Sequence, residues 1–313
     1  MKILFIFARP QPYNSVTVRE KPCGGTEKAV IFLGEALARL GHEVEWITTT
    51  DELRAYSGSP DVVVTQIAEL LQHFPAARKV WWAHHFSDQP VIKANAGFAR
   101  AYADQIVTLS SCHNQDFSSV LRLDSVTIGH GVWLEELNTT QIKDPYRLIY
   151  ASTPFRGLER IPELFRAIKA KEPRATIGIA SSMATYGEAG GDDQYQELFR
   201  ELAAIPGVDL LGALNQEALY REYARASVFF YPCVWPETYC LALDEAIAHG
   251  CRPVVSRIGA LPERDWTGHA LDRIPEFPEA ALWVMANPER MAPSWTPRDW
   301  MAVAREWEER VLS

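Results

Sequence analysis

Two glutamates, Glu237 and Glu245, stand in the stretch of the chain that is richest in residues able to do chemistry, from Tyr231 to Glu263. The pattern predicts a strand that ends at Tyr231 and a helix that begins near Thr238. Free N–H groups in the first turn of a helix favour a negatively charged group. A carboxylate can accept hydrogen bonds from two neighbouring hydroxyls, such as those of a ribose or a hexose. Together these features suit a nucleotide diphosphate ligand.

The alternative for these glutamates is purely structural. Glu237 would then be an ordinary acid at a helix N-terminus, and Glu245 would be an exposed helix residue. However, Glu245 has apolar neighbours on its helix, namely Leu241, Ala242, Ala246 and Ile247. This composition predicts a largely buried helix, and a buried carboxylate needs a polar partner. We therefore expect Glu245 to be buried and partnered.

The pattern P-E-T-x6-E-A-x-A-x-G, followed by P-V-V, closely resembles glycosyltransferase family 4, the large retaining group with the GT-B fold. The paired glutamates of that family, separated by seven residues, match Glu237 and Glu245. The resemblance implies that Glu245 holds the donor ribose and that Glu237 lies near the hydroxyls of the donor sugar. It also implies a nucleotide-sugar donor.

A second part of the family pattern lies upstream, in the sequence IYASTPFRGL. Family members usually place two basic residues here, and both contact the donor diphosphate. Arg156, just before Gly157, matches the second basic position. The first position is occupied by Ser152 or Thr153, which departs from the family pattern. One phosphate contact is thus expected to come from a hydroxyl or from elsewhere in the chain.

In the amino-terminal half, Gly24 and Gly25 match the glycine-rich turn that follows the first strand in the family. Glycines allow the backbone to approach a phosphate or a sugar closely. His84 and His85 end the strand KVWWAHH, where the family commonly has a histidine close to the transferred sugar. Strand alternation lets only one of them face a cleft, and the sequence slightly favours His84.

The remaining candidates also follow from the resemblance. Ser110, His85 and His130 match strand-end positions that could contact an acceptor or a sugar. Leu214 and Leu219 lie in the segment that holds the nucleobase in the family. The complete candidate donor site comprises Gly24, Gly25, Ser152, Thr153, Arg156, Leu214, Leu219, Glu237, Thr238, Tyr239, Cys240, Leu241 and Glu245, and the candidate catalytic residues are Glu237, His84 and Arg156.

Strands alternating with helices must position these residues. The predicted strands are Lys2–Phe7, Val44–Thr48, Asp61–Thr65, Lys79–Ala83, Gln105–Leu109 and Ser125–Ile128, then Arg147–Ala151, Ala175–Ala180, Val208–Leu211, Val228–Tyr231 and Pro253–Ser256. The alternation predicts an α/β fold with two Rossmann-like domains, whose parallel sheets place their carboxyl ends at a cleft between the domains.

The polar stretch 135–144 breaks the alternation and is the best linker candidate. We expect an acceptor-side domain over residues 1–143 and a donor-side domain over residues 144–295. A strongly amphipathic final helix is expected within residues 296–313 and should pack back on the first domain. Its apolar face comprises Trp300, Val303, Ala304, Trp307 and Val311.

Composition narrows the classes of function. The 313 residues carry a net charge of −9, which argues against general attraction to nucleic acid or to an anionic membrane. The five cysteines are scattered, as is typical of reduced thiols in a cytoplasmic protein. The opening run MKILFIFARP is too short for a signal peptide, and no later run has membrane length. We expect no stable membrane insertion.

The resemblance therefore implies a retaining hexosyltransferase of the EC 2.4 class that uses a nucleotide-sugar as substrate, and we expect it to need neither a metal ion nor a cofactor. Neither the donor base and sugar nor the acceptor is specified. Three alternatives remain: a catalytically degenerate GT-B binding protein, a GT-B nucleotide-sugar epimerase or phosphorylase, and a Rossmann oxidoreductase. The last is disfavoured because no GxGxxG follows Phe7.

Overall fold

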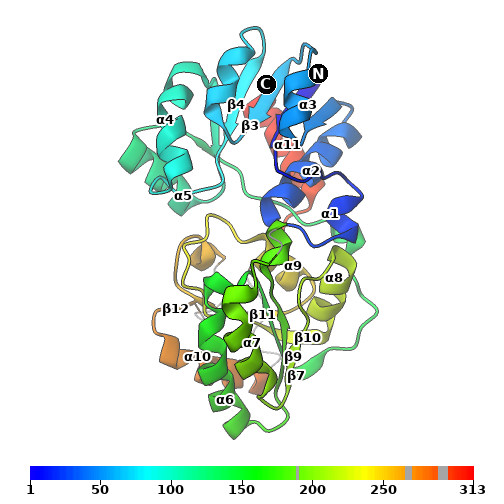
Figure 1. Ribbon diagram of the computed structural model, residues 1–313, viewed down its shortest axis with the longest axis vertical. Coiled ribbons are helices and arrows are strands. Elements are labelled where there is room, and N and C mark those ends of the chain that lie inside the picture. Colours follow the sequence, from blue (N-terminus) through cyan, green and yellow to red (C-terminus); the bar gives the residue numbers. More distant parts are fainter. Residues whose placement is uncertain (188–189, 265–269, 288–294) are drawn as a thin grey trace. The chain divides into compact units, whose positions relative to one another are not determined.

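The computed structural model describes residues 1–187, 190–264, 270–287 and 295–313 (Figure 1). The chain forms two compact units. The first unit comprises Met1–Val18, Gly25–Gly131 and Arg298–Ser313, and the second comprises Arg19–Gly24 and Val132–Pro297.

The second unit includes Val132–Pro297 and so begins upstream of the stretch 135–144, the predicted linker. Two contacts explain why residues 132–143 pack within the second unit. The backbone N–H of Asn138 donates to Nε2 of His249 at 3.2 Å. The guanidinium of Arg19 pairs with Glu136 at 2.7 Å. The segment from Val132 onward is therefore part of the second unit rather than a free connection.

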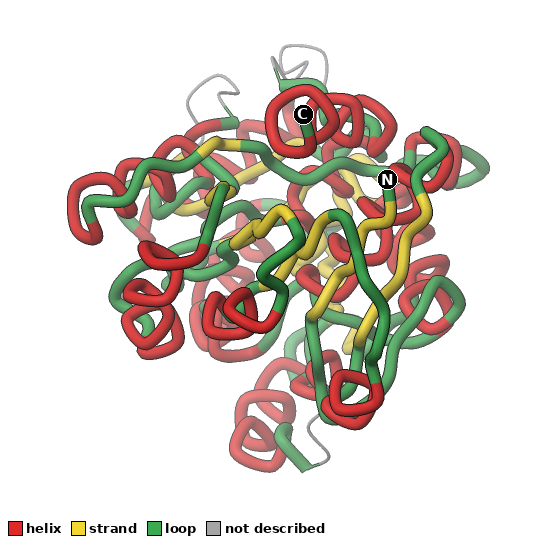
Figure 2. The backbone as a smooth tube through the Cα atoms, turned by 90° about the horizontal axis from the view of Figure 1, so that it is seen from above, coloured by secondary structure: helices red, strands yellow, loops and turns green. Residues whose placement is uncertain are grey.

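The first unit is built on a sheet of six parallel strands in the order β2-β1-β3-β4-β5-β6. The strands are β1 Lys2–Ile6, β2 Glu43–Ile47, β3 Val62–Thr65, β4 Arg78–Trp82, β5 Gln105–Thr108 and β6 Val126–Thr127. The helices in this part of the chain are α1 Thr17–Glu20, α2 Gly25–Arg39, α3 Thr50–Ala55, α4 Pro90–Tyr102 and α5 Ser111–Asp116. Apolar runs such as β3 are fully buried because helices cover both faces of the sheet (Figure 2).

The second unit repeats this design, with six parallel strands in the order β12-β11-β10-β7-β8-β9. Its strands are β7 Asp144–Ala151, β8 Thr176–Ala180, β9 Val208–Leu210, β10 Ala226–Tyr231, β11 Arg252–Ser256 and β12 Ala270–Leu271. Its helices are α6 Ile161–Lys171, α7 Gln196–Ala203, α8 Gln216–Arg225, α9 Leu241–Ala248 and α10 Phe277–Ala286. The predicted class of two Rossmann-like α/β domains is confirmed.

The carboxyl-terminal helix α11, Trp300–Trp307, continues as a π-helical turn over Glu308–Leu312. Its predicted apolar face is buried, and the helix packs against α2 within the first unit. The Trp307 ring meets the Trp82 ring edge to face, with centroids 5.0 Å apart. The tail therefore completes the core of the first unit.

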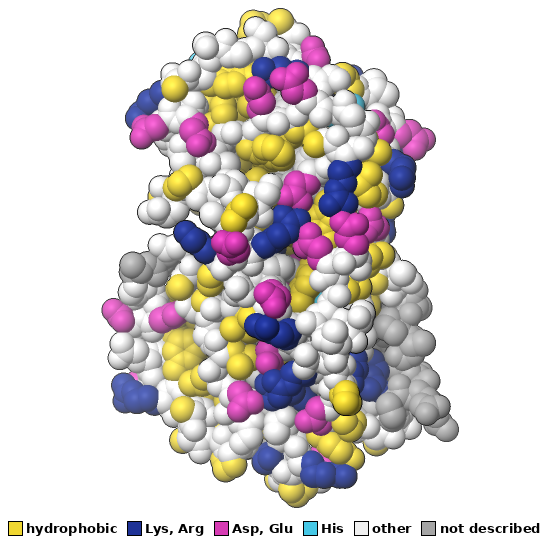
Figure 3. All heavy atoms as spheres, turned by 90° about the vertical axis from the view of Figure 1, so that its right-hand side faces the viewer, with side chains coloured by type: hydrophobic (Ala, Val, Ile, Leu, Met, Phe, Trp, Pro, Cys, Tyr) yellow, Lys and Arg dark blue, Asp and Glu magenta, His cyan; other side chains and the backbone are white. Residues whose placement is uncertain are grey.

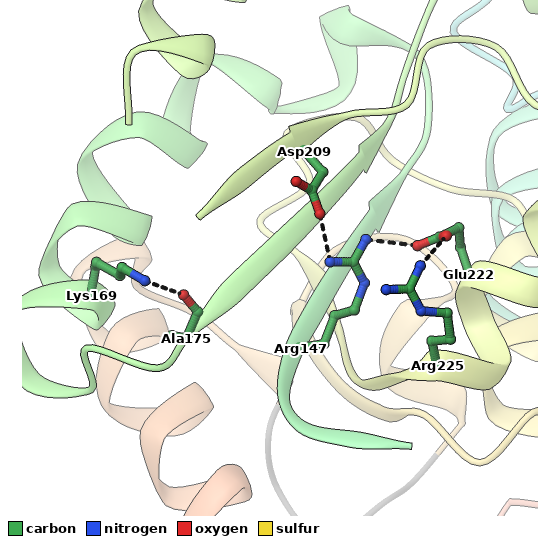
Figure 4. Close-up of polar contacts among 6 residues, drawn as sticks. All are labelled: Arg147, Lys169, Ala175, Asp209, Glu222 and Arg225. Atoms are coloured by element: carbon green, nitrogen blue, oxygen red, sulfur yellow. Dashed lines mark hydrogen bonds and ion pairs between the residues drawn. The ribbon is translucent and has the colours of Figure 1, made fainter. Parts of the chain in front are cut away.

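An ionic cluster centred on the buried side chain of Arg147 secures the sheet of the second unit. Arg147 of β7 donates to Asp209 of β9 at 2.8 Å and to Glu222 of α8 at 2.7 Å (Figure 4). Arg225 also pairs with Glu222, at 2.9 Å. The cluster ties the edge strand β9 and helix α8 to the centre of the sheet, so we assign it a structural role.

On the face drawn in Figure 3, basic and acidic side chains of the described residues lie beside each other in both units. This arrangement agrees with the many surface ion pairs, such as Arg166–Glu201 at 2.8 Å. Within the described ranges, no helix combines the length and the apolar character needed to cross a membrane.

Candidate functional site

The candidate site in the second unit forms where two neighbouring parallel strands end. Strand β7 ends at Ala151 and β10 ends at Tyr231, and the two strands are paired. Their carboxyl ends therefore share one edge of the sheet, where ligands of such folds bind. The hydroxyls of Ser152 and Tyr231 lie 3.1 Å apart and join the two loops that follow.

An ion pair between these loops forms the centre of the site. Nη1 of Arg156 donates to Oε1 of Glu237 at 2.5 Å, and the Tyr231 hydroxyl donates to the same oxygen at 2.6 Å. Nη2 of Arg156 reaches the hydroxyl of Tyr186 at 3.2 Å. Burial by itself lowers the pKa of Arg156, but Glu237, Tyr231 and Tyr186 raise it well above its usual value. Burial and Glu237 raise the pKa of Tyr231, so its hydroxyl stays a donor.

Two glycines allow the loops to pack this closely. Gly157 has φ +112°, and a Cβ there would lie 2.3 Å from the carbonyl oxygen of Pro232. Gly259 has φ +55°, and a Cβ there would lie 2.4 Å from the carbonyl oxygen of Glu237. That carbonyl accepts the N–H of Ala260 at 2.7 Å. The backbone of Glu237 is thus fixed by contacts that only glycine permits.

The prediction that the helix begins near Thr238 is wrong. Helix α9 begins at Leu241, and Cys240 adopts the left-handed conformation with φ +80°. Thr238 is a residue type that commonly caps a helix. However, the hydroxyl of the next residue, Tyr239, donates a hydrogen bond to Asp244 at 2.6 Å, and this contact holds Tyr239 outside the helix. The candidate donor-binding residues Thr238, Tyr239 and Cys240 therefore form a loop in front of the helix. Free N–H groups of the helix begin at Leu241.

A buried network that the sequence analysis missed supports this loop. Nε of Arg264 lies 3.3 Å from Oδ1 of Asp244, and these side chains are 2% and 0% exposed. The guanidinium carbon of Arg264 lies 3.9 Å from the centre of the Tyr239 ring, and Nη1 donates to the carbonyl of Ala260 at 3.0 Å. Burial lowers the pKa of Arg264, but Asp244 raises it above its usual value, so Arg264 stays charged. Asp244 has the same apolar neighbours as Glu245, so its burial and its need for a polar partner were predictable from the sequence.

Glu245 is 2% exposed, which confirms its predicted burial. Its Oε1 accepts a hydrogen bond from Nε2 of Gln216 at 2.9 Å and one from the Tyr220 hydroxyl at 3.4 Å. Both partners come from α8 and are four residues apart, a helical spacing that is visible in the sequence. Leu214 and Leu219, the candidates for the nucleobase, flank the start of this helix and are half-buried. Helix α8 thus connects the segment of Leu214 and Leu219 to Glu245.

The histidine candidates lie in the first unit. His84 is buried, with its ring against Phe7, Trp82 and His130, and the His84 and His130 rings stack with centroids 5.6 Å apart. Burial first, and His130 second, lower the pKa of His84 well below its usual value, so it is neutral at pH 7. His85 is exposed, and its carbonyl oxygen lies 2.9 Å from Nε2 of His113.

The other candidates in the amino-terminal half are positioned by helix starts. Ser110 is the N-cap of α5 and accepts the N–H of His113 at 3.3 Å. Gly24 precedes α2 and Gly25 is its first residue. Arg9 pairs with Glu27 in the first turn of α2 at 2.5 Å.

Among the residues that the structure describes, no group of three or more His, Cys, Asp or Glu side chains could hold a metal ion. Of the adjacent Asp192 and Asp193, Asp192 closes a loop. It accepts the Ser182 hydroxyl at 2.5 Å and the N–H of Met183 at 2.7 Å.

Part of the chain matches a family of known proteins. Residues 140–264 match the model of the family described as Glycosyl transferases group 1, and these residues include both loops of the site. No curated protein matches the chain in sequence.

Solved structures are similar in fold over nearly the whole chain. HepE of Anabaena, in complex with UDP and glucose, has 14% identity and a TM-score of 0.75, with 100% of each chain covered. Sucrose-phosphate synthase of Thermosynechococcus elongatus has 16% identity and a TM-score of 0.76, with 98% of this chain and 97% of that chain covered. AviGT4, a glycosyltransferase involved in avilamycin A biosynthesis, has 17% identity and a TM-score of 0.69, covering 99% and 96%. The chain has the GT-B fold.

Proposed function

We propose that the chain is a retaining glycosyltransferase that moves a sugar from a nucleotide-diphosphate sugar to an acceptor hydroxyl without a metal ion, in the cytoplasm. One observation carries the proposal: Arg156 and Glu237, from loops that follow neighbouring strands, meet at 2.5 Å at the carboxyl edge of the sheet. The family match over residues 140–264 and the UDP complexes of HepE support a nucleotide-sugar donor.

In this proposal the diphosphate is bound by Arg156, the amides at the start of α9 and the Gly24–Gly25 turn. The Arg156 side chain is 21% exposed, so part of its guanidinium can reach a phosphate oxygen. Positive charge at this point stabilises the negative charge that grows on the leaving group. The Ser152 or Thr153 hydroxyl takes the first basic position of the family pattern.

Glu245 orients the ribose and Glu237 the hydroxyls of the donor sugar. Glu237 is anchored by Arg156 and Tyr231, so its carboxylate is held in place before a ligand arrives. With retention of configuration, the departing phosphate oxygen accepts the proton of the acceptor hydroxyl, and no separate base is required. His84, which is buried and neutral, contributes through its backbone carbonyl.

A thermal-shift screen tests the proposal. The purified protein is heated with UDP-, GDP-, ADP-, CMP- and dTDP-sugars without added metal. A ligand at 100 times its Kd stabilises the folded state by about 2.7 kcal/mol. We expect a shift with one nucleotide class that Glu245→Ala abolishes and that the exposed control on α8, Glu217→Ala, retains. Absence of a shift with every nucleotide would contradict the proposal.

A second candidate is a GT-B binding protein that has lost catalysis. The observation that favours it is the absence of a basic residue at Ser152 or Thr153. Such a protein would give the thermal shift but would leave the donor intact after prolonged incubation. Consumption of the donor excludes this candidate.

A further inference from the structure

An exposed tyrosine lies against the solvent side of Arg156. The guanidinium makes one hydrogen bond inward and one outward: Nη1 donates to Glu237 at 2.5 Å, and Nη2 donates to the hydroxyl of Tyr186 at 3.2 Å. Glu237 is buried, whereas Tyr186 is 44% exposed. A ligand that approaches Arg156 from solvent on the Nη2 side therefore meets the Tyr186 hydroxyl.

The loop after strand β8 holds Tyr186 in this place. Tyr186 ends the short 3₁₀ helix Met183–Tyr186, which is capped by the side chain of Ser182. Asp192 accepts the hydroxyl of Ser182 and closes the loop. Strand β8 pairs with β7, and the loop after β7 carries Arg156. Tyr186 thus reaches the candidate site from the neighbouring strand, at the edge of the sheet where ligands of such folds bind.

The Tyr186 hydroxyl still has its proton to donate. A tyrosine hydroxyl carries one donor and can also accept, and here the oxygen accepts from Arg156. Among the residues that the structure describes, this hydroxyl makes no second hydrogen bond, so its proton has no acceptor in the protein. An anion can accept from a hydroxyl and from the adjacent guanidinium at the same time, and such charge-assisted bonds are the strong ones.

The two hydroxyls at the first basic position of the family pattern are less suited to this task. Tyr231 gives its only proton to Glu237 at 2.6 Å, so across the 3.1 Å contact with Ser152 its oxygen must accept the proton of Ser152. Oγ1 of Thr153 is buried. Neither side chain offers a ready donor to a ligand, whereas Tyr186 does.

We propose that Tyr186 is a donor-binding residue whose hydroxyl donates to an oxygen of the diphosphate that Arg156 binds. The inference rests on the proposed function and adds a residue to it. A diphosphate has several charged oxygens, so one ligand can accept from both neighbouring donors. Negative charge grows on the leaving phosphate in the transition state, so this bond strengthens there. Tyr186 therefore contributes more to turnover than to binding.

Isothermal titration calorimetry tests the inference with UDP, GDP and ADP, each compared with its nucleoside uridine, guanosine or adenosine. The variant Tyr186→Phe keeps the ring and removes only the hydroxyl. The control Tyr102→Phe makes the same change at the end of α4, where the side chain is 39% exposed. The melting temperature of each variant without ligand reports folding, and turnover of the corresponding nucleotide-sugar is measured in parallel.

We expect one nucleoside diphosphate to bind the parent and Tyr186→Phe to weaken that binding about tenfold, as the loss of a hydrogen bond to a charged group implies. The nucleoside should bind parent and variant equally, turnover should fall by a larger factor than binding, and Tyr102→Phe should behave as the parent does.

Three results would overturn the inference: unchanged diphosphate binding by Tyr186→Phe, an equal loss of nucleoside binding, or tighter diphosphate binding. Tighter binding would mean that the hydroxyl only fills the place of a phosphate oxygen in the ligand-free protein. A parent that binds none of the three diphosphates contradicts the proposed function itself, and this result is distinct because it appears before any variant is compared.

Discussion

Replacing Arg156 with methionine removes the charge that faces Glu237 and keeps most of the side-chain volume. The two side chains are 21% and 9% exposed, so water screens the pair only weakly. Removing one partner of a buried ion pair costs about 3–5 kcal/mol because the other charge is left uncompensated. Tyr231 still donates to Glu237 at 2.6 Å in the variant. We therefore expect the lower limit, about 3 kcal/mol of unfolding free energy, for Arg156→Met.

A double-mutant cycle isolates the interaction. Glu237→Leu alone leaves Arg156 with only the Tyr186 hydroxyl, and we expect a loss of about 2 kcal/mol. In the double variant neither charge remains buried and unpaired. Its loss of unfolding free energy should therefore be smaller than the sum of the losses of the two single variants. The expected coupling energy is about 2 kcal/mol.

The exposed pair Arg166–Glu201 provides the matched control. Its atoms are 2.8 Å apart, but the side chains are 52% and 47% exposed. Surface pairs of this kind are worth about 0–1 kcal/mol. Equilibrium urea unfolding at pH 7 measures both cycles, with the transition of the second unit analysed separately because two units can unfold independently. A coupling between Arg156 and Glu237 no larger than that of the control would refute the reasoning.

Three further predictions follow from local geometry. Gly259→Ala should abolish nucleotide binding because its Cβ would collide with the backbone of Glu237. The control Gly41→Ala lies at φ +96° with nothing within 4 Å, so it should cost only about 1 kcal/mol of stability and bind the nucleotide normally. Thermal shift with and without nucleotide distinguishes the two variants. The pKa of His84 is lowered on folding, so the unfolded chain binds the extra proton and stability should fall as pH drops through the unfolded value near 6.5. His84→Phe should weaken the pH dependence of the unfolding free energy, measured with urea from pH 8 to pH 5. An unchanged pH dependence would contradict this. Arg264→Met should lose about 3–5 kcal/mol in urea unfolding, since its buried carboxylate partner remains, and a loss below about 1 kcal/mol would show that the pair is solvated.

Periodicity and apolar runs predicted most of the fold. Each of the eleven predicted strand ranges overlaps a strand. Strands buried on both faces, such as β3 and β10, are recognisable as continuous apolar runs. The two-residue strand β12, Ala270–Leu271, is too short to give such a signal. Helix α10, Phe277–Ala286, is apolar on most sides and shows little periodicity, and it was not predicted.

The candidate site was predicted in composition but not in contacts. Sequence reasoning selected Arg156 and Glu237 separately, yet their pairing joins positions 81 apart and depends on the order of strands in the sheet. The start of α9 was misplaced because a left-handed cysteine at Cys240 has no sequence signature. The same holds for Arg264, whose link to Asp244 exists only once the loops have folded.

The most direct test of the account is the fate of the nucleotide-sugar identified by thermal shift. Proton NMR follows its anomeric signal in the presence of EDTA and a methyl glycoside acceptor, with wild type compared with Glu237→Gln and the control Glu217→Gln. We expect wild type and the control to consume the donor despite the chelator. The new linkage should have the donor's anomeric configuration, and Glu237→Gln should be severely impaired. A donor that binds but stays intact, or a product of inverted configuration, would contradict the central claim.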